Sequence, residues 1–416
     1  MKVKRLSFIL ASIWMLCAAQ HAQARPASEP WADSDSIRIS LLTCAAGEEI
    51  YSLFGHTALR YENYTRGTDI VFNYGIFDFS APNFVLRFAL GETDYRLGTS
   101  SYERFIAEYS YLGRDVWQQV LNLKQDEKVR LVKLLEENYQ PENRVYRYNF
   151  FYDNCATRPR DMVEKAISGK LVYAEDMDTP QQGTTFRDIL RQYSAGHLWS
   201  RFGMDLCMGS KADEPISRRV QMFVPFYVQS VFSKARIQDE QGGLRPLVVE
   251  ERKVVEVESH PASGWLDRFT PQWMSCLLFV LTLCCTLYGV WRGKSLWGID
   301  LVLFLAAGLA GCILAFLTLF SQHPAVSPNY LLFVFHPFHL LCLPFFLPRV
   351  RRGLTSRYMI ANFVVLTFFI VSIAVIPQRF DLAVLPLALS LLVRSGGNLL
   401  TARKINSRQR RTIHWT

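Results

Sequence analysis

The chain has 416 residues, half of them hydrophobic, and a formal net charge of +9 at pH 7. A basic balance can indicate nucleic-acid binding, but much of the Arg and Lys lies in short loops and a tail of the apolar C-terminal part. We therefore attribute the excess positive charge to loops that set the orientation of membrane spans, and we exclude a nucleic-acid partner. Charged residues are scattered through the first two thirds of the chain, whereas long apolar runs follow from Trp273 onward, so the sequence predicts two unlike parts.

The N-terminus has the three parts of a secretory signal peptide. A basic start, residues 1–5, precedes an apolar run at 6–19 and the small-residue site Ala22-Gln23-Ala24. We expect cleavage after Ala24, so that 25–241 form an exported domain, followed by a linker at 242–270.

The first half of the exported domain alternates β and α patterns. Period-two runs predict strands at 37–43, 56–61, 69–74 and 115–123. Helical patterns predict a short helix at 47–54 and longer ones at 102–111 and 126–139. The exported domain is therefore expected to be α+β around one core.

A candidate nucleophile follows at Cys155. An aromatic run leads into the polar segment 153–161, where Asp, Asn, Thr and Pro favour the start of a helix that ends near Ile167. Cys155 is expected at or just before this helix start. The positive end of the helix, with Arg158 and Arg160 close by, would lower the pKa of the thiol and so favour the thiolate, which is the nucleophile.

A histidine that takes or holds the proton would complete a Cys–His pair. His56 and His197 are the main candidates in the exported domain, and we favour His56 because it begins a predicted strand whereas His197 lies in a Ser-Ala-Gly loop. Asn73, on the next strand, is the first choice for orienting the imidazole ring. Other groups could do the same: a backbone carbonyl, Asp69 or Asp78.

Structural roles are the alternative for each of these residues, since an isolated Cys is commonly a buried small residue and an isolated His a hydrogen-bonded one. The exported domain holds three cysteines, Cys44, Cys155 and Cys207, an odd number in an oxidising space. A Cys44–Cys207 disulfide could form and leave Cys155 as a free thiol. The domain has no ligand spacing of the kind that zinc sites use, so neither a metal nor a cofactor is expected.

The apolar part contains five segments that are long enough, or nearly so, to cross a hydrocarbon core of ~30 Å as helices. They lie at residues 273–291, 299–320, 330–347, 358–376 and 380–393. We expect a five-helix transmembrane bundle at 271–400 and a basic tail at 401–416. The basic loops and the tail fall on the cytoplasmic side if the first domain is exported, as the positive-inside rule requires.

Polar residues in and beside the third segment are candidates for a role within the membrane. His336 and His339 lie three residues apart, and Asn329 precedes the segment. Ionisable groups in a bilayer are commonly functional, although this pair could instead hydrogen-bond a neighbouring helix.

Three blocks, residues 41–60, 71–79 and 148–161, together resemble the Lnb family, the Bacteroidota-type lipoprotein N-acyltransferases. The resemblance covers nearly the whole chain. The order of His56 first and Cys155 later, at a helix start, is also similar to the circularly permuted papain-like enzymes related to lecithin:retinol acyltransferase and NlpC-type peptidases. This second similarity implies a permuted papain-like fold with Cys155 as nucleophile and His56 as base. The lipid enzymes have a second His as third residue, which this sequence lacks after His56, so the role of Asn73 stays open.

The resemblance implies transfer of an acyl chain from a phospholipid to Cys155 as a thioester, then to the α-amine of a diacylated lipoprotein's N-terminal cysteine. The expected location is the inner membrane, with the catalytic domain in the periplasm. Backbone N–H groups at the helix start, with the Asn154 side chain, would stabilise the oxyanion. Candidate substrate-binding residues are Arg158, Arg160, Tyr74 and Ser52.

Two other functions remain open. A membrane-tethered papain-like peptidase or amidase, acting on cell-wall peptides or envelope proteins, would use the same Cys and His with water as the acceptor. A non-catalytic envelope assembly protein would tolerate the loss of Cys155.

Overall fold

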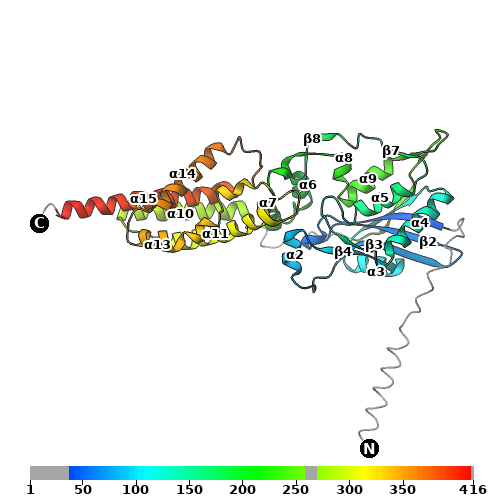
Figure 1. Ribbon diagram of the computed structural model, residues 1–416, viewed down its shortest axis with the longest axis horizontal. Coiled ribbons are helices and arrows are strands. Elements are labelled where there is room, and N and C mark those ends of the chain that lie inside the picture. The colour runs from blue at the N-terminus through cyan, green and yellow to red at the C-terminus, as the bar shows by residue number, and fades with distance from the viewer. Residues whose placement is uncertain (1–36, 258–268, 414–416) are drawn as a thin grey trace, which may run out of the picture.

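The computed structural model describes residues 37–257 and 269–413, which form two parts of different architecture lying end to end along the long axis (Figure 1). The N-terminal part is an α+β domain and the C-terminal part is helical. Both features were predicted from the sequence and are confirmed. The predicted signal peptide, 1–24, lies outside the described residues.

The centre of the N-terminal domain is a seven-stranded antiparallel sheet in the order β12-β5-β1-β2-β3-β4-β6. The strands are β1 (Ile37–Cys44), β2 (His56–Asn63), β3 (Thr68–Ile76), β4 (Asp94–Ser101), β5 (Val116–Leu121), β6 (Val145–Arg147) and β12 (Val248–Val255). Because side chains alternate across a strand, β1 sends Ile39 and Leu41 into one apolar cluster and Leu42 and Cys44 into another. Both faces of the central sheet are therefore buried.

Helices and short strands complete the domain. The helical elements are η2 (Ile50–Ser52), α2 (Phe84–Leu90), α3 (Tyr102–Tyr111), α4 (Gln125–Tyr139), α5 (Thr157–Ala166), α6 (Phe186–Tyr193), α7 (Leu198–Cys207), η3 (Ser210–Asp213), α8 (Arg218–Gln221) and α9 (Pro225–Lys234). The short strands are β7 (Lys170–Val172), β8 (Pro180–Thr185), β9 (Pro215–Ser217), β10 (Arg236–Gln238) and β11 (Leu244–Pro246). The helices α4, α5 and α9 supply side chains to the cluster on one face of the sheet, and α3 supplies Phe105 and Tyr109 on the other.

The predicted elements differ from these in two places. The short helix expected at 47–54 is only the single 3-10 turn η2. The linker expected at 242–270 is folded in its first half, because β12 pairs with β5 and forms the edge of the main sheet.

The helical part contains α10 (Pro271–Arg292), α11 (Trp297–Phe320), η5 (Tyr330–Phe333), α12 (Phe338–Leu341), α13 (Leu343–Arg351), α14 (Arg357–Ser372) and α15 (Val384–Ile413). Within the described residues, three helices are long and apolar enough to cross a membrane: α10, α11 and the first 24 residues of α15. The third predicted segment is instead bent by 79° between α12 and α13 and would be a fourth span only as a broken one. The fourth predicted segment, α14, has 16 residues.

By length and composition, the described residues therefore support three or four spans, and the expectation of five is not confirmed. Proline explains the break in the third segment, because it removes a backbone donor and clashes with the preceding turn. Pro337 stands at the start of α12 and Pro344 at the start of α13.

The loop after α11 is hydrogen-bonded to the N-terminal domain. The backbone N–H of Gln322 donates to the carbonyl of Leu90 at 2.9 Å, and the His323 ring nitrogen Nε2 lies 2.7 Å from the carbonyl oxygen of Phe88. Both carbonyls belong to α2, so this helix is fixed against the end of α11.

The loop before α15 docks on the same domain. The guanidinium of Arg379 lies 2.7 Å from a carboxylate oxygen of Asp188 and 3.0 Å from one of Asp213. The side-chain amide of Gln378 donates to the carbonyl of Met208 at 3.0 Å. Both loops thus lie on the side of the N-terminal domain. The loops at Gly293 and Gly353 lie instead beside the C-terminal end of α15, where Lys404 Nζ donates to the Trp291 carbonyl at 2.8 Å and Gly353 packs against Ile405.

Candidate active site

His56 and Asn73 form the first contact of the site. His56 begins β2, and Asn73 lies in β3 opposite Ala58, so His56 and Asn73 are diagonal neighbours on one face of the sheet. The His56 Nε2 atom lies 2.6 Å from Asn73 Oδ1. Because a carbonyl oxygen can only accept, Nε2 carries the ring proton and Nδ1 is left as the basic nitrogen.

Gly75 brings Cys155 to this pair. Its φ is +97°, a conformation that only glycine adopts readily. A Cβ placed there would lie 3.3 Å from Cys155 Cβ and 3.8 Å from His56 Cε1. Cys155 and His56 therefore meet at the glycine's missing side chain. Cys155 precedes α5 by two residues, as the sequence predicted.

The protonation states differ from the sequence-based expectation. Burial raises the pKa of the Cys155 thiol to about 11. The N–H of Thr57 and the charge of Arg114 act in the opposite direction, but their effect is smaller than that of burial. Burial likewise lowers the pKa of His56 to about 4, against the opposing hydrogen bond to Asn73. At neutral pH the site therefore holds a neutral thiol beside a neutral imidazole.

The predicted lowering of the thiol pKa by Arg158 and Arg160 is thus wrong, because carboxylates neutralise both cations. The Arg158 guanidinium makes two hydrogen bonds, of 2.6 and 2.8 Å, to Asp153 and lies 3.6 Å from the centre of the Tyr146 ring. Arg160 is buried and bonded to Asp161 at 2.8 Å. Neither arginine is placed as a free substrate ligand.

Asn154 is a capping residue and has no amide hydrogen to spare for an oxyanion. Its Nδ2 donates to the carbonyls of Phe150 and Phe223, both at 2.8 Å. Its Oδ1 accepts the N–H groups of Ala156 and Thr157 at the start of α5, at 2.8 and 3.0 Å. The predicted oxyanion role is therefore corrected to a structural one.

The backbone N–H of Cys155 is the donor that remains at this position. Apart from the sulfur of its own side chain, it has no hydrogen-bond partner in the described part of the chain. A donor in this position could stabilise an oxyanion formed on a carbonyl that the sulfur attacks.

Tyr74 and Ser52 are structural as well. The Tyr74 side chain is fully buried, and its hydroxyl donates to Asn138 Oδ1 at 2.7 Å. The Ser52 hydroxyl donates to the carbonyl of Glu49 at 2.9 Å within η2. The proposed Cys44–Cys207 disulfide is absent: both cysteines are free, Cys44 in the core at the end of β1 and Cys207 at the end of α7.

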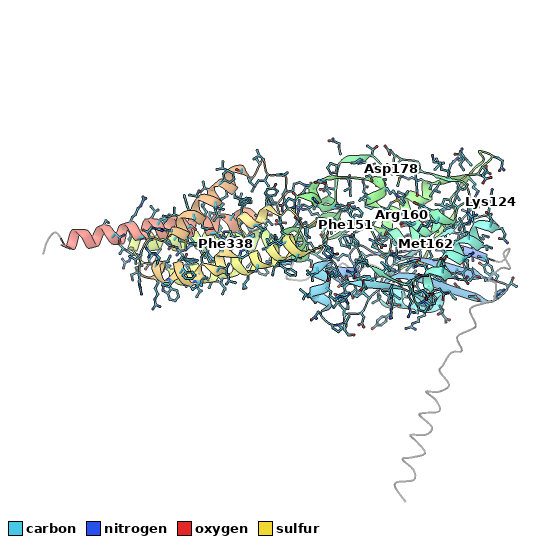
Figure 2. The ribbon with its side chains drawn as sticks, viewed as in Figure 1. Lys124, Phe151, Arg160, Met162, Asp178 and Phe338 are labelled. Carbon is cyan, nitrogen blue, oxygen red and sulfur yellow. The ribbon has the colours of Figure 1, made fainter. Side chains whose placement is uncertain are left out.

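The candidates in the membrane part lie apart from this site. The rings of His336 and His339 stack with centroids 3.8 Å apart. His339 is also bonded to the Val334 carbonyl and, at 2.6 Å, to the Tyr358 hydroxyl. Figure 2 shows the neighbouring Phe338 well inside the helical part, whereas Arg160 and Met162 of α5 lie in the N-terminal domain. Asn329 caps η5 and donates to the carbonyl of Leu206.

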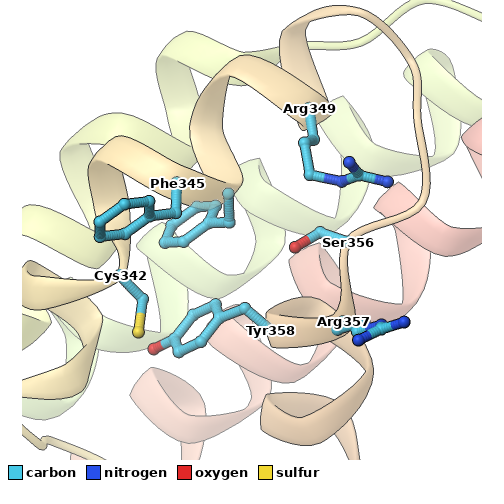
Figure 3. Close-up of a pocket in the computed structure, with 7 residues that line it drawn as sticks. Cys342, Phe345, Arg349, Ser356, Arg357 and Tyr358 are labelled. Carbon is cyan, nitrogen blue, oxygen red and sulfur yellow. The ribbon is translucent and has the colours of Figure 1, made fainter.

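A cavity of about 520 Å³ also lies in the helical part, between α13 and the start of α14 (Figure 3). It is lined by Cys342, Phe345, Phe346, Arg349, Ser356, Arg357 and Tyr358. None of the candidate catalytic residues lines it.

Sequence reasoning missed two residues of the site. Gly75 directly follows the strand predicted at 69–74 and lies inside the longer β3. A glycine in a strand can mark a close backbone approach, and this signal could have identified Gly75. Arg114 follows α3 in a loop and gave no signal. Its Nε donates to the carbonyl of Ala45 at 2.8 Å, and its charge acts on both Cys155 and His56.

Two family models match the chain. Residues 27–192 match a model described as the Lnb N-terminal periplasmic domain, and residues 262–405 match one described as the Lnb transmembrane domain. No curated protein and no solved structure matches the chain.

Proposed function

The chain belongs to the Lnb family of membrane proteins with a periplasmic domain, and from this premise we propose that it is a lipoprotein N-acyltransferase of the inner membrane. One observation carries the assignment of its catalytic residues. The side chain of Cys155 and the imidazole of His56 both border Gly75, and the hydrogen bond to Asn73 holds the ring so that Nδ1 is the base. The other five roles suggested by the sequence, for Asn154, Arg158, Arg160, Tyr74 and Ser52, are not used.

The first half of the proposed reaction makes an acyl-thioester. Because the thiol is neutral, His56 Nδ1 accepts its proton as the sulfur attacks the ester carbonyl of a phospholipid. The oxyanion receives a hydrogen bond from the Cys155 N–H. When the intermediate collapses, the C–O bond to the glycerol breaks and the imidazolium returns the proton to the departing oxygen, which leaves a lysophospholipid and an acylated Cys155.

The second half transfers the acyl chain to nitrogen. The α-amine of a diacylated lipoprotein's N-terminal cysteine attacks the thioester, and His56 accepts a proton from it. The C–S bond breaks, the sulfur takes up the proton from His56, and an amide is released. The neutral thiol and imidazole are restored, so no cofactor is needed.

The arrangement of residues supports a papain-like assignment. A cysteine at a helix start faces a histidine on an antiparallel strand, and the histidine is oriented by an amide oxygen from the next strand. Asn73 therefore takes the place of the second His found in the related lipid enzymes.

The test uses cells that lack their own lipoprotein N-acyltransferase. The full chain is expressed there, and the N-terminal peptide of a reporter lipoprotein is weighed by mass spectrometry. We expect a gain of one acyl mass with the wild type, and none with Cys155→Ala or His56→Ala. Cys207→Ala is the matched control, since Cys207 is another half-buried free cysteine of the same domain, and it should behave as wild type.

Each outcome separates the candidate functions. The absence of an acyl mass with wild type would refute the transferase assignment. A gain that survives Cys155→Ala would leave the activity but reject the thioester. Cleavage of envelope peptides by the wild type without acyl gain would favour the peptidase.

A further inference from the structure

An exposed apolar surface surrounds α2 on the N-terminal domain. Its side chains come from η2, from the loop after β3 and from α2 itself, and they are between 43% and 79% exposed: Ile50, Tyr51, Phe79, Val85, Leu86 and Phe88. We refer to them as the α2 surface. Ring contacts of 5.6 Å between Tyr51 and Phe79 and of 5.1 Å between Phe79 and Phe84 make it continuous. Apolar surfaces of this kind mark sites of interaction.

The α2 surface lies beside the end of the helical part that adjoins the N-terminal domain. The bonds of Gln322 and His323 to α2 fix it against the outer end of α11, and Figure 1 shows α2 on the side of the domain that faces the helices. At that end Leu319 and Phe320 are 72% and 63% exposed. Trp273, at the outer start of α10, is also largely exposed, as aromatic residues at a bilayer interface are. The apolar surface of the bundle therefore continues onto α2.

A row of aromatic rings joins this surface to the candidate nucleophile. The Phe77 ring packs on Phe79 at 4.7 Å and stacks on Tyr95 at 4.9 Å, and Tyr95 stacks on Tyr148 at 3.9 Å. Tyr148 and Cys155 pack against the same core cluster. Phe77 also follows Gly75 by two residues. The rings thus extend from the exposed surface into the core cluster against which Cys155 packs.

We propose that the α2 surface lies in the outer leaflet of the membrane and that one acyl chain of a phospholipid follows Phe77 to Cys155. This inference rests on the proposed function and specifies its donor as a long-chain ester held in a bilayer. The burial of apolar side chains, and not the attraction of charges, drives this contact with lipid. Arg87 is the basic residue of α2, and its charge is already paired with Asp94 at 2.8 Å, so it does not attract lipid head groups.

The test compares two acyl donors on the full chain in nanodiscs. One donor is the dioleoyl phosphatidylcholine of the nanodisc, and the other is soluble p-nitrophenyl butyrate; the acylated Cys155 is measured by intact mass. Leu86→Asp should slow acylation from the bilayer about tenfold or more, because a carboxylate resists entry into lipid, and leave the soluble donor unchanged. The control is Val249→Asp, which changes a comparably exposed side chain on β12 at the end of the sheet away from His56.

Equal rates for Leu86→Asp and Val249→Asp with the bilayer donor would overturn the inference. So would an equal loss with both donors, which indicates damage to the site itself. A second measurement needs no activity: benzoylphenylalanine at position 86 should crosslink to phospholipid on illumination, and at position 249 it should not. If the wild type acylates Cys155 from neither donor, the proposed function fails, and crosslinking at position 86 still decides whether the surface meets lipid.

Discussion

The substitution Gly75→Ala tests the geometry of the site with a single methyl group. The glycine has φ +97°, where an L-residue costs about 1–2 kcal/mol. The new Cβ would also stand 3.3 Å from Cys155 Cβ, closer than ordinary van der Waals contact, so Cys155 must move by a few tenths of an ångström relative to His56. Since a misplacement of ~1 Å can cost about 100-fold in rate, we expect acylation to fall about tenfold or more.

Gly242→Ala separates the two effects. Gly242 has φ +83°, and a Cβ there would meet nothing within 4 Å, so it carries a similar backbone penalty without a contact at the site. Both variants should lower the thermal unfolding temperature, but only Gly75→Ala should slow formation of the Cys155 thioester in purified protein. If the two variants acylate Cys155 at equal rates, Gly75 does not position the nucleophile and the reasoning is refuted.

Three further predictions follow from the contacts of the N-terminal domain. Asn154→Ala leaves two buried carbonyls and the N–H groups at the start of α5 without their hydrogen-bond partners, so we expect it to destabilise the fold by about 2–4 kcal/mol. Thermal unfolding measures this loss, and an unchanged midpoint would contradict the capping role. Acylation by a soluble ester should be independent of pH from 8 down to 6 and fall only as the pH nears 4, because neutral His56 is the base and its pKa is about 4; a fall centred near 6.5 would reject this. Arg379→Met removes the ion pairs to Asp188 and Asp213 and should raise hydrogen exchange in α6; unchanged exchange would show that these pairs do not hold the domain on the bundle.

The positions of the three proposed catalytic side chains were predictable because each depends on local pattern. Alternation along two adjacent strands puts His56 and Asn73 on one face, and helix-start residues put Cys155 before α5. The protonation state was not predictable, because burial of the thiol depends on parts of the chain far away in sequence. The role of Asn154 was hidden for the same reason, since one of its partners is the carbonyl of Phe223.

In the helical part, hydropathy found the apolar segments but not their ends. The predicted fifth segment ends at residue 393, directly before Arg394. In the structure the Arg394 guanidinium lies 2.7 and 2.8 Å from the carboxylate oxygens of Asp300 on α11, so the charge is neutralised inside the bundle and α15 continues to Ile413. A pair 94 residues apart has no signature in a hydropathy window.

The bonds of Gln322, His323 and Arg379 to the N-terminal domain hold the site at one height above the bilayer. For the proposed transferase, donor and acceptor must therefore bring their reacting atoms to that height in turn. The N-terminal domain does not need to move relative to the helical part between the two half-reactions. A lipid-anchored amine is held near the surface by its own acyl chains, whatever polypeptide follows it. We accordingly expect the acceptor to be selected by the depth of its anchor rather than by its amino-acid sequence.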